Sequence, residues 1–154
     1  MKTIEIHTQG GLKHKVQTEV YDAQVLNDQL NSNDLITVLI GDFIIQRIDV
    51  KRIIPLSISN VEGTKKVEVH TNGGKVIEIT TNDYDPIYLN EQLNSSNTIT
   101  VVIGDYIFSR IDVKQIVPVK EEPIVEEPIE TVTPPTTEEP PEETDEQTEP
   151  TEQL

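Results

Sequence analysis

The sequence predicts an α+β, β-rich fold in which two tandem ββαβββ modules of a small, barrel-like type precede a disordered acidic tail. Three observations predict it. The chain repeats itself at a spacing of 63 residues, and hydrophobic residues inside each copy alternate with the period of β-strands. The C-terminal segment is rich in proline and glutamate and too polar to bury a core.

The repeat defines the organisation of the chain. Residues 2–56 align with residues 65–119 without a gap, and 29 of the 55 aligned pairs are identical. Two copies are too few for a solenoid, so the pattern indicates a duplicated domain. The predicted organisation is module one at 1–56, a linker at 57–64, module two at 65–119 and the tail at 120–154. The aligned segments are called the first and second repeats below.

A β-hairpin is expected to open each module. Apolar and polar residues alternate over residues 3–8, and the loop that follows, residues 9–11, has two glycines. A three-residue loop with its last glycine in the left-handed conformation fits this segment. In the second copy the same loop places Val69 opposite Ile77, which keeps the apolar residues on one face.

A short helix is expected next. Asp22 and Asp85 are suited to cap its N-terminus, and Pro86 occupies the first helical position of the second copy, where a missing N–H costs nothing. Leu26 and Leu30 share one side of this helix.

Three short strands are expected after the helix. Residues 36–40 and 43–47 form the second hairpin around a Gly-Asp turn, residues 49–51 form a single turn, and residues 53–56 form the last strand. The equivalents of these elements recur in the second copy.

The charge distribution narrows the choice of partner. The chain has 28 Asp and Glu against 12 Lys and Arg, and 13 of the acids lie in residues 121–154, which contain no base. Binding to nucleic acid or to an anionic membrane requires clustered Lys and Arg, so neither is an expected partner. A protein partner is expected, and self-association is left open.

The residue inventory argues against an enzyme. There is no cysteine, no nucleophile motif and no glycine-rich phosphate loop, and no carboxylate lies within an apolar segment. His7, His14 and His70 are interpreted as surface or core-margin residues, so no metal or cofactor is expected. No signal peptide or membrane-spanning stretch is recognised, which favours the cytoplasm or a virion as the location.

An Arg-x-Asp-x-Lys run is the densest charged feature shared by both copies. It lies beside an apolar hairpin and could bind an acidic group on a protein partner. The structural alternative is that the aspartate caps a turn and the arginine pairs with a nearby carboxylate. The candidate partner-binding residues are Arg47, Asp49, Lys51, Arg110, Asp112, Lys114, Phe43 and Tyr106.

Two resemblances accompany these patterns. Residues 40–55, from Ile-Gly-Asp to Ile-Ile-Pro, resemble the closing strands of small SH3-like or Sm-like barrels. The Leu-Asn-x-Gln-Leu-Asn and Ile-Gly-Asp stretches are similar to short, mostly unassigned proteins of phages and prophages of Gram-positive bacteria, some of which are duplicated and end in Pro/Thr/Glu tails. The second resemblance implies a phage or mobile-element origin.

These observations favour a non-enzymatic tandem binding or structural module, a phage accessory or virion-associated protein. Duplication raises avidity for a repeated target such as a capsid or tail lattice. The first alternative is an acidic inhibitor of a host protein that imitates nucleic acid. A further alternative is an Sm-like oligomer that binds RNA.

Overall fold

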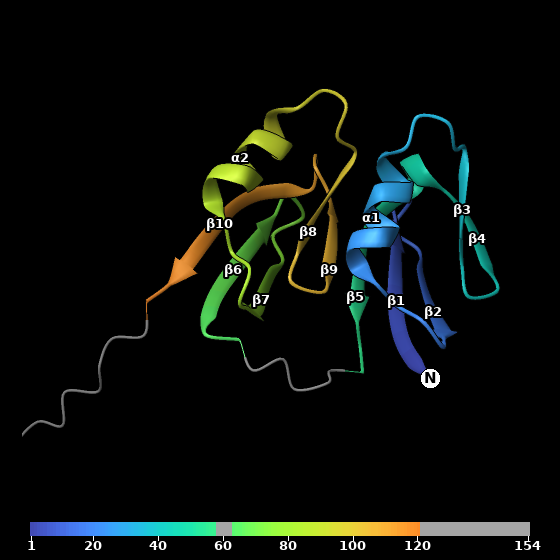
Figure 1. The fold of residues 1–154 in the computed structure, drawn as a ribbon, viewed down its shortest axis with the longest axis horizontal. Helices are drawn as coiled ribbons and strands as arrows, with labels where there is room; N and C mark the ends of the chain where they lie inside the picture. Colours follow the sequence, from blue (N-terminus) through green and yellow to red (C-terminus); the bar gives the residue numbers. More distant parts are fainter. Residues whose placement is uncertain (58–62, 121–154) are drawn as a thin grey trace, which may run out of the picture. The chain divides into compact units, whose positions relative to one another are not determined.

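The computed structural model describes residues 1–57 and 63–120, which belong to one compact unit (Figure 1). Most of the predicted linker and nearly all of the predicted disordered tail lie outside these residues. The described part is β-rich, with two helices and several antiparallel sheets.

The β-strands and α-helices follow the same order in both repeats. The first repeat contains β1 (Lys2–Thr8), β2 (Lys13–Thr18), α1 (Ala23–Asn31), β3 (Thr37–Ile40), β4 (Phe43–Gln46), the 3-10 turn η1 (Arg47–Asp49) and β5 (Val50–Pro55). The second repeat contains β6 (Lys65–Thr71), β7 (Val76–Thr81), α2 (Pro86–Asn94), β8 (Thr100–Ile103), β9 (Tyr106–Ser109) and β10 (Val113–Val119).

The described strands are distributed over three sheets, and one sheet contains strands from both repeats. Its order is β2-β1-β5-β9-β8, so the β8–β9 hairpin of the second repeat extends the sheet of the first. The second repeat keeps a three-stranded sheet, β10-β6-β7, and the first repeat keeps an isolated hairpin, β3-β4. The equivalent hairpins β3–β4 and β8–β9 therefore differ, because only β8–β9 pairs with a further strand.

The first hairpin of each repeat forms as predicted. Val69 lies opposite Ile77 in the register of β6 and β7. Gly11 and Gly74 have φ angles of 87° and 82°, the left-handed region that the three-residue loop requires. Alternation therefore carries Val69 to the buried face, where its side chain is fully enclosed.

The helices begin at the predicted caps. The Asp22 carboxylate accepts hydrogen bonds from the Gln24 and Val25 backbone N–H groups at 3.0 and 3.1 Å, and Asp85 does the same in the second repeat. Leu26 and Leu30 are buried, as their spacing predicts.

Two details of the sequence interpretation are wrong. The turn lies at residues 47–49 instead of 49–51, because Val50 is fully buried and already pairs with Thr8 at the start of β5. In addition, His7, interpreted as a surface or core-margin residue, is only 6% exposed, because β1 is a central strand between β2 and β5. Both differences arise because β5 packs along the length of β1.

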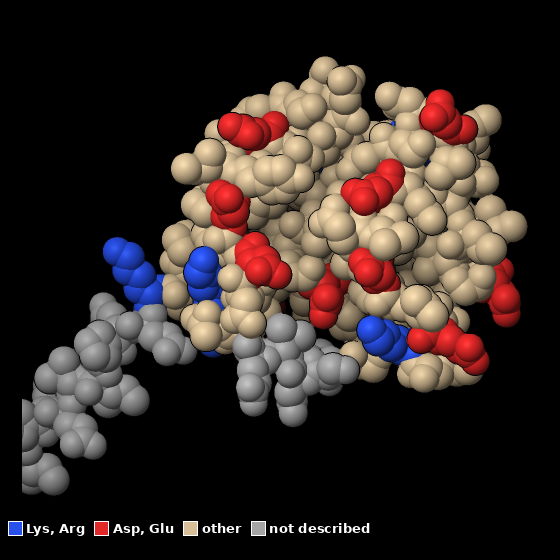
Figure 2. Space-filling view, viewed as in Figure 1, with Lys and Arg blue, Asp and Glu red and all other residues tan. Residues whose placement is uncertain are grey.

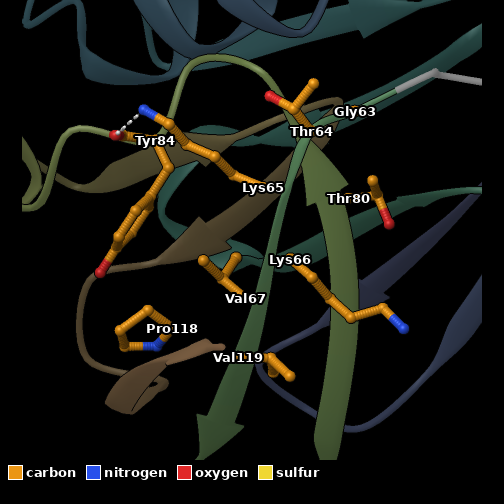
Figure 3. A pocket seen from close by; sticks show the side chains of 9 residues that line it. All are labelled: Gly63, Thr64, Lys65, Lys66, Val67, Thr80, Tyr84, Pro118 and Val119. Atoms are coloured by element: carbon orange, nitrogen blue, oxygen red, sulfur yellow. Dashed lines mark hydrogen bonds between the residues drawn. The ribbon is translucent and has the colours of Figure 1, made fainter. Parts of the chain in front are cut away.

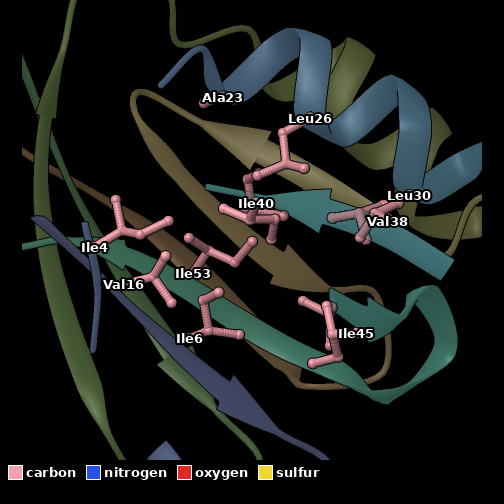
Figure 4. Packing of buried hydrophobic residues seen from close by; sticks show 12 residues of the cluster. Ile4, Ile6, Val16, Ala23, Leu26, Leu30, Val38, Ile40, Ile45 and Ile53 are labelled. Atoms are coloured by element: carbon pink, nitrogen blue, oxygen red, sulfur yellow. The ribbon is translucent and has the colours of Figure 1, made fainter. Parts of the chain in front are cut away.

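Within residues 1–57 and 63–120, the buried hydrophobic residues form two clusters. In the first, side chains from β1, α1, β3 and β5 point toward one another (Figure 4). This cluster also includes Ile107, a residue of the second repeat. The second cluster lies within the second repeat, around Val67, Val69 and Phe108. Neither described helix is long and apolar enough to cross a membrane.

Candidate functional site

The junction between the repeats is the candidate site, because buried polar residues from both repeats meet there. Strands β5 and β9 pair antiparallel, with Arg52 opposite Phe108 and Ile53 opposite Ile107. The side chains of Ile53, Ile107 and Phe108 are fully buried. Backbone pairing and apolar burial thus coincide at this junction.

A buried ion pair lies at the same junction. Arg52 Nη2 is 2.9 Å from Asp112 Oδ2, and Lys51 Nζ is 3.8 Å from Asp112 Oδ1. The Arg52 and Asp112 side chains are only 5% and 2% exposed, and Arg52 Nε, Arg52 Nη1 and Asp112 Oδ2 have no hydrogen-bond partner within the described residues, so the contact is an ion pair without hydrogen-bond geometry. The Asp112 carboxylate therefore offsets most of the free-energy cost of burying the Arg52 guanidinium. Removal of one partner would leave the other charge unpaired.

Helix α1 holds the first residues of β8 through two asparagines. Asn31 Oδ1 accepts hydrogen bonds from the N–H groups of Ile99 and Thr100 at 2.7 and 2.9 Å, and Asn31 Nδ2 donates to the Thr100 carbonyl at 2.9 Å. Asn27 Oδ1 accepts from the Thr100 hydroxyl at 2.8 Å in a buried contact. The Asn31 bonds satisfy backbone groups of Ile99 and Thr100, and the Asn27 bond satisfies the buried Thr100 hydroxyl.

A tyrosine hydroxyl forms a further contact across the junction. Tyr21 Oη donates to the Asp105 carbonyl at 2.7 Å, in the turn between β8 and β9. Burial raises the pKa of the Tyr21 phenol well above its ordinary value of 10, and the carboxylates of Asp105 and Asp22 raise it further. The hydroxyl therefore remains a hydrogen-bond donor throughout the usual pH range.

Sequence reasoning did not identify Asn27, Asn31 or Tyr21 as junction residues. All three are identical in the two repeats, and the asparagines lie four positions apart on one helix face. That spacing was the available signal. It did not indicate what the face would contact.

The predicted partner-binding residues are not gathered at one surface. Asp112 and Lys51 meet at the junction. Arg47 instead donates to the Leu30 carbonyl and to Asn33 Oδ1, both at 3.4 Å, and Asp49 Oδ1 accepts from the Gln9 N–H at 3.2 Å. The contacts of Arg47 and Asp49 thus lie within the first repeat.

Of the remaining four candidates, two are basic residues that line a groove and two are aromatic residues in contact with another ring. Arg110 and Lys114 line a groove between α2 and β10. The half-buried Phe43 ring lies 4.9 Å from the His14 ring, measured between centroids, and Tyr106 stacks on Phe108 at 6.4 Å. Burial also raises the pKa of the Tyr106 hydroxyl. Phe43 and Tyr106 occupy equivalent positions in the two second hairpins.

One apolar residue of the charged run is exposed in both repeats. The side chains of Ile48 and Ile111 are 62% and 66% exposed, although the aspartate that follows each is less accessible. Each isoleucine precedes a lysine by three positions, Lys51 or Lys114. Each repeat therefore has one exposed isoleucine close in sequence to a lysine.

Two hollows border β10 of the second repeat. The groove between α2 and β10 has a volume of about 420 Å³. A smaller hollow of about 320 Å³ lies at the start of β6, where Lys65 Nζ donates to the Tyr84 carbonyl at 3.3 Å (Figure 3). Pro118 and Val119 from β10 close one side of it.

The surface charge does not favour an anionic ligand on the face drawn in Figure 2. Acidic side chains are spread over this face, while basic ones are visible mainly at its lower margin. Among residues 1–57 and 63–120, no group of three or more His, Asp or Glu side chains is arranged to hold a metal ion. Comparison of the chain with protein-family models, with curated proteins and with solved structures found no match.

Proposed function

We propose that this chain is a non-enzymatic tandem binding or structural protein, built from two small ββαβββ modules that offer one binding surface twice. The target is a repetitive protein assembly such as a capsid or tail lattice, and the chain is an accessory of that assembly. The observation that carries the proposal is the matched exposure of Ile48 and Ile111, 62% and 66%, on equivalent turns.

The chemistry of the two turns supports protein binding. An exposed isoleucine can fill an apolar pocket on a partner, and the neighbouring Lys51 or Lys114 can pair with a carboxylate at the rim. Isolated exposed apolar residues are common on protein surfaces. Recurrence at the same position of two repeats is the feature that distinguishes these two.

The junction supports a repetitive target. Strand pairing between β5 and β9 and the buried Arg52–Asp112 contact restrict the movement of one turn relative to the other. Two sites at a constrained spacing gain avidity only where the target repeats with a compatible spacing, and the gain can reach about 10²–10⁴.

The proposal is tested with the full chain immobilised as bait for extracts of its source cells. Wild type is compared with Ile48→Asp, Ile111→Asp and the double variant. We expect a particle-forming protein to be captured by wild type, less by each single variant and far less by the double variant. Because both side chains are exposed, the thermal midpoints should remain close to that of wild type.

Candidate assemblies recovered in this way are then sedimented with the purified chain. Equal co-sedimentation of wild type and a normally folded double variant would eliminate these turns as the binding surface. Capture of a single soluble enzyme or regulator, with no assembly, would contradict the repetitive target.

A further inference from the structure

The junction between the repeats is formed by two different surfaces. The first repeat contributes an acceptor face, made of α1 and the outer edge of β5. The second repeat contributes a donor hairpin, β8–β9. Because the repeats share the same elements, each has both surfaces, and the intramolecular junction uses only one of each.

The unused donor hairpin is β3–β4. It forms a two-stranded sheet in which β4 has no second neighbour among the described strands, whereas β9 lies between β8 and β5. Its outward residues are accessible: Ile44 is 67% exposed, while the equivalent Ile107 is fully buried. Thr37 is likewise exposed, while Thr100 is fully buried.

The unused acceptor face consists of α2 and β10. Strand β10 pairs only with β6 within the described residues, whereas β5 pairs with both β1 and β9. The groove of about 420 Å³ between α2 and β10 occupies the position that β8–β9 fills on the first repeat, and Asn90 and Asn94 line it. Both asparagines are exposed, while the equivalent Asn27 is buried.

Each residue of the observed junction has an equivalent in the other repeat, 63 residues away. Replacing every junction residue by its equivalent pairs the two unused surfaces. The Ile53–Ile107 pair becomes Ile116 opposite Ile44. Other contacts transfer between identical residue types: Asn31 with Thr100 becomes Asn94 with Thr37, Tyr21 with Asp105 becomes Tyr84 with Asp42, and Lys51 with Asp112 becomes Lys114 with Asp49.

We propose that this protein self-associates head to tail, with β4 of one copy adding to the β10 edge of the next, and with α2 covering the added hairpin. Such an interface joins two different surfaces, so successive copies form a closed ring or an open filament. The proposal is independent of the partner proposed above. Ile111 remains 66% exposed beside the intramolecular junction, so its equivalent Ile48 remains accessible beside the intermolecular one.

The buried ion pair does not transfer, and neither does the hydrogen bond from Gln9 Nε2 to Ser109 Oγ, because Asn72 and Gln46 stand at the equivalent positions. Gln115 stands where Arg52 stands in the first repeat, so the buried guanidinium that faces Asp112 has no counterpart opposite Asp49. The interface between copies is therefore weaker than the intramolecular junction. Because it joins separate molecules, its occupancy depends on concentration. This difference would keep the chain dissociated when dilute.

The proposal is tested by sedimentation velocity of the full chain over a wide concentration range. Salt is added to screen a net charge of −16. We expect the average mass of wild type to rise with concentration. Ile44→Lys disables the donor hairpin and Asn94→Lys disables the acceptor face, so each variant alone should remain monomeric. An equimolar mixture should form a dimer and no larger species, because one functional surface of each kind remains.

Ile48→Lys is the matched control, because it introduces the same residue at a similarly exposed isoleucine outside the predicted contact. It should associate like wild type. If Ile44→Lys fails to fold, Leu39→Lys on the same hairpin, at 63% exposure, replaces it. Wild type that remains monomeric at all concentrations, or a mixture that does not form the dimer, overturns the proposal. Both outcomes are expected if another segment of the chain covers the groove.

The register is tested separately, because the chain contains no cysteine. Ile44→Cys and Ile116→Cys, in separate chains, should form a disulfide-linked heterodimer when mixed under oxidising conditions. Gln115→Arg should tighten association about tenfold or more by giving Asp49 a second cationic partner beside Lys114. Absence of the cross-link, or unchanged association of Gln115→Arg, would refute this register.

Discussion

The two repeats place identical residues in opposite environments. Ile107 and Thr100 are fully buried in the second repeat, while Ile44 and Thr37 are exposed in the first. For the asparagines the pattern is reversed, because Asn27 is buried and Asn90 is exposed. Position relative to the junction therefore determines which copy of a residue is buried, although the residue type and the local element are the same.

This difference makes each repeat a control for the other. A substitution at a junction position should cost stability, and the same substitution 63 residues away should cost little. The comparisons below use dilute protein, so that the proposed association does not bury the second copy.

The largest effect is expected at the buried ion pair. Asp112→Ala leaves Arg52 buried without its carboxylate, so we expect a loss of about 3–5 kcal/mol in the free energy of unfolding. Asp49→Ala removes one hydrogen bond to the Gln9 N–H and should cost about 1 kcal/mol. Urea denaturation measures both. Similar losses for the two variants would mean that the Arg52–Asp112 contact is not maintained in solution.

A core substitution comes next. Ile107→Ala removes a fully buried side chain from the first hydrophobic cluster and should cost about 2–5 kcal/mol. Ile44→Ala removes an exposed side chain and should change stability by about 0.5 kcal/mol or less. The same urea titrations decide the comparison. An equally destabilising Ile44→Ala in dilute protein would contradict the exposed position of β4.

The asparagines should show a smaller difference. Asn31→Ala leaves the Ile99 and Thr100 N–H groups without their acceptor, and we expect a loss of about 1–3 kcal/mol. Asn94 bonds within its own helix, to the Asn90 carbonyl at 2.8 Å, so Asn94→Ala should be nearly neutral. Hydrogen exchange adds a local test, because the Thr100 amide should lose protection only in Asn31→Ala.

The smallest effect concerns pH. Burial lowers the pKa of His7 below its ordinary value of 6.5. As the pH falls, the unfolded chain binds this proton before the folded chain does. The contribution to stability is therefore complete above pH 6.5 and is lost as the pH falls through the folded pKa. The His7 side chain also lowers the pKa of Glu5 by hydrogen bonding, which adds a loss of the same sign below pH 4.5.

His7→Gln should flatten the change in urea midpoint just below pH 6.5. His70→Gln is the matched control, because the His70 side chain is 28% exposed and that of His7 is 7% exposed. A pH profile of His7→Gln that retained the wild-type slope would assign the acid sensitivity to other groups.

Local structure was largely predictable from short stretches of sequence. Gly11 and Gly74 predicted the left-handed loop position, and Asp22 and Asp85 predicted the helix caps. These predictions succeed because a turn or a cap is determined by contacts among a few neighbouring residues. The turn before β5 was misplaced, because its position depends on β1, more than 40 residues earlier.

The sequence by itself determined the duplication, the order of elements in each repeat and the registers of the first hairpins. Only the tertiary structure decided that β9 pairs with β5, that Arg52 faces Asp112, and that Asn31 reaches the start of β8. The physical reason is that the backbone edge of a strand offers the same N–H and C=O groups whatever its side chains. The side chains of β4 and β9 are similar enough for either strand to pair with a further edge. Long-range strand pairing, and not the local sequence pattern, therefore decided that β9 pairs with β5 and that β4 stays at an edge.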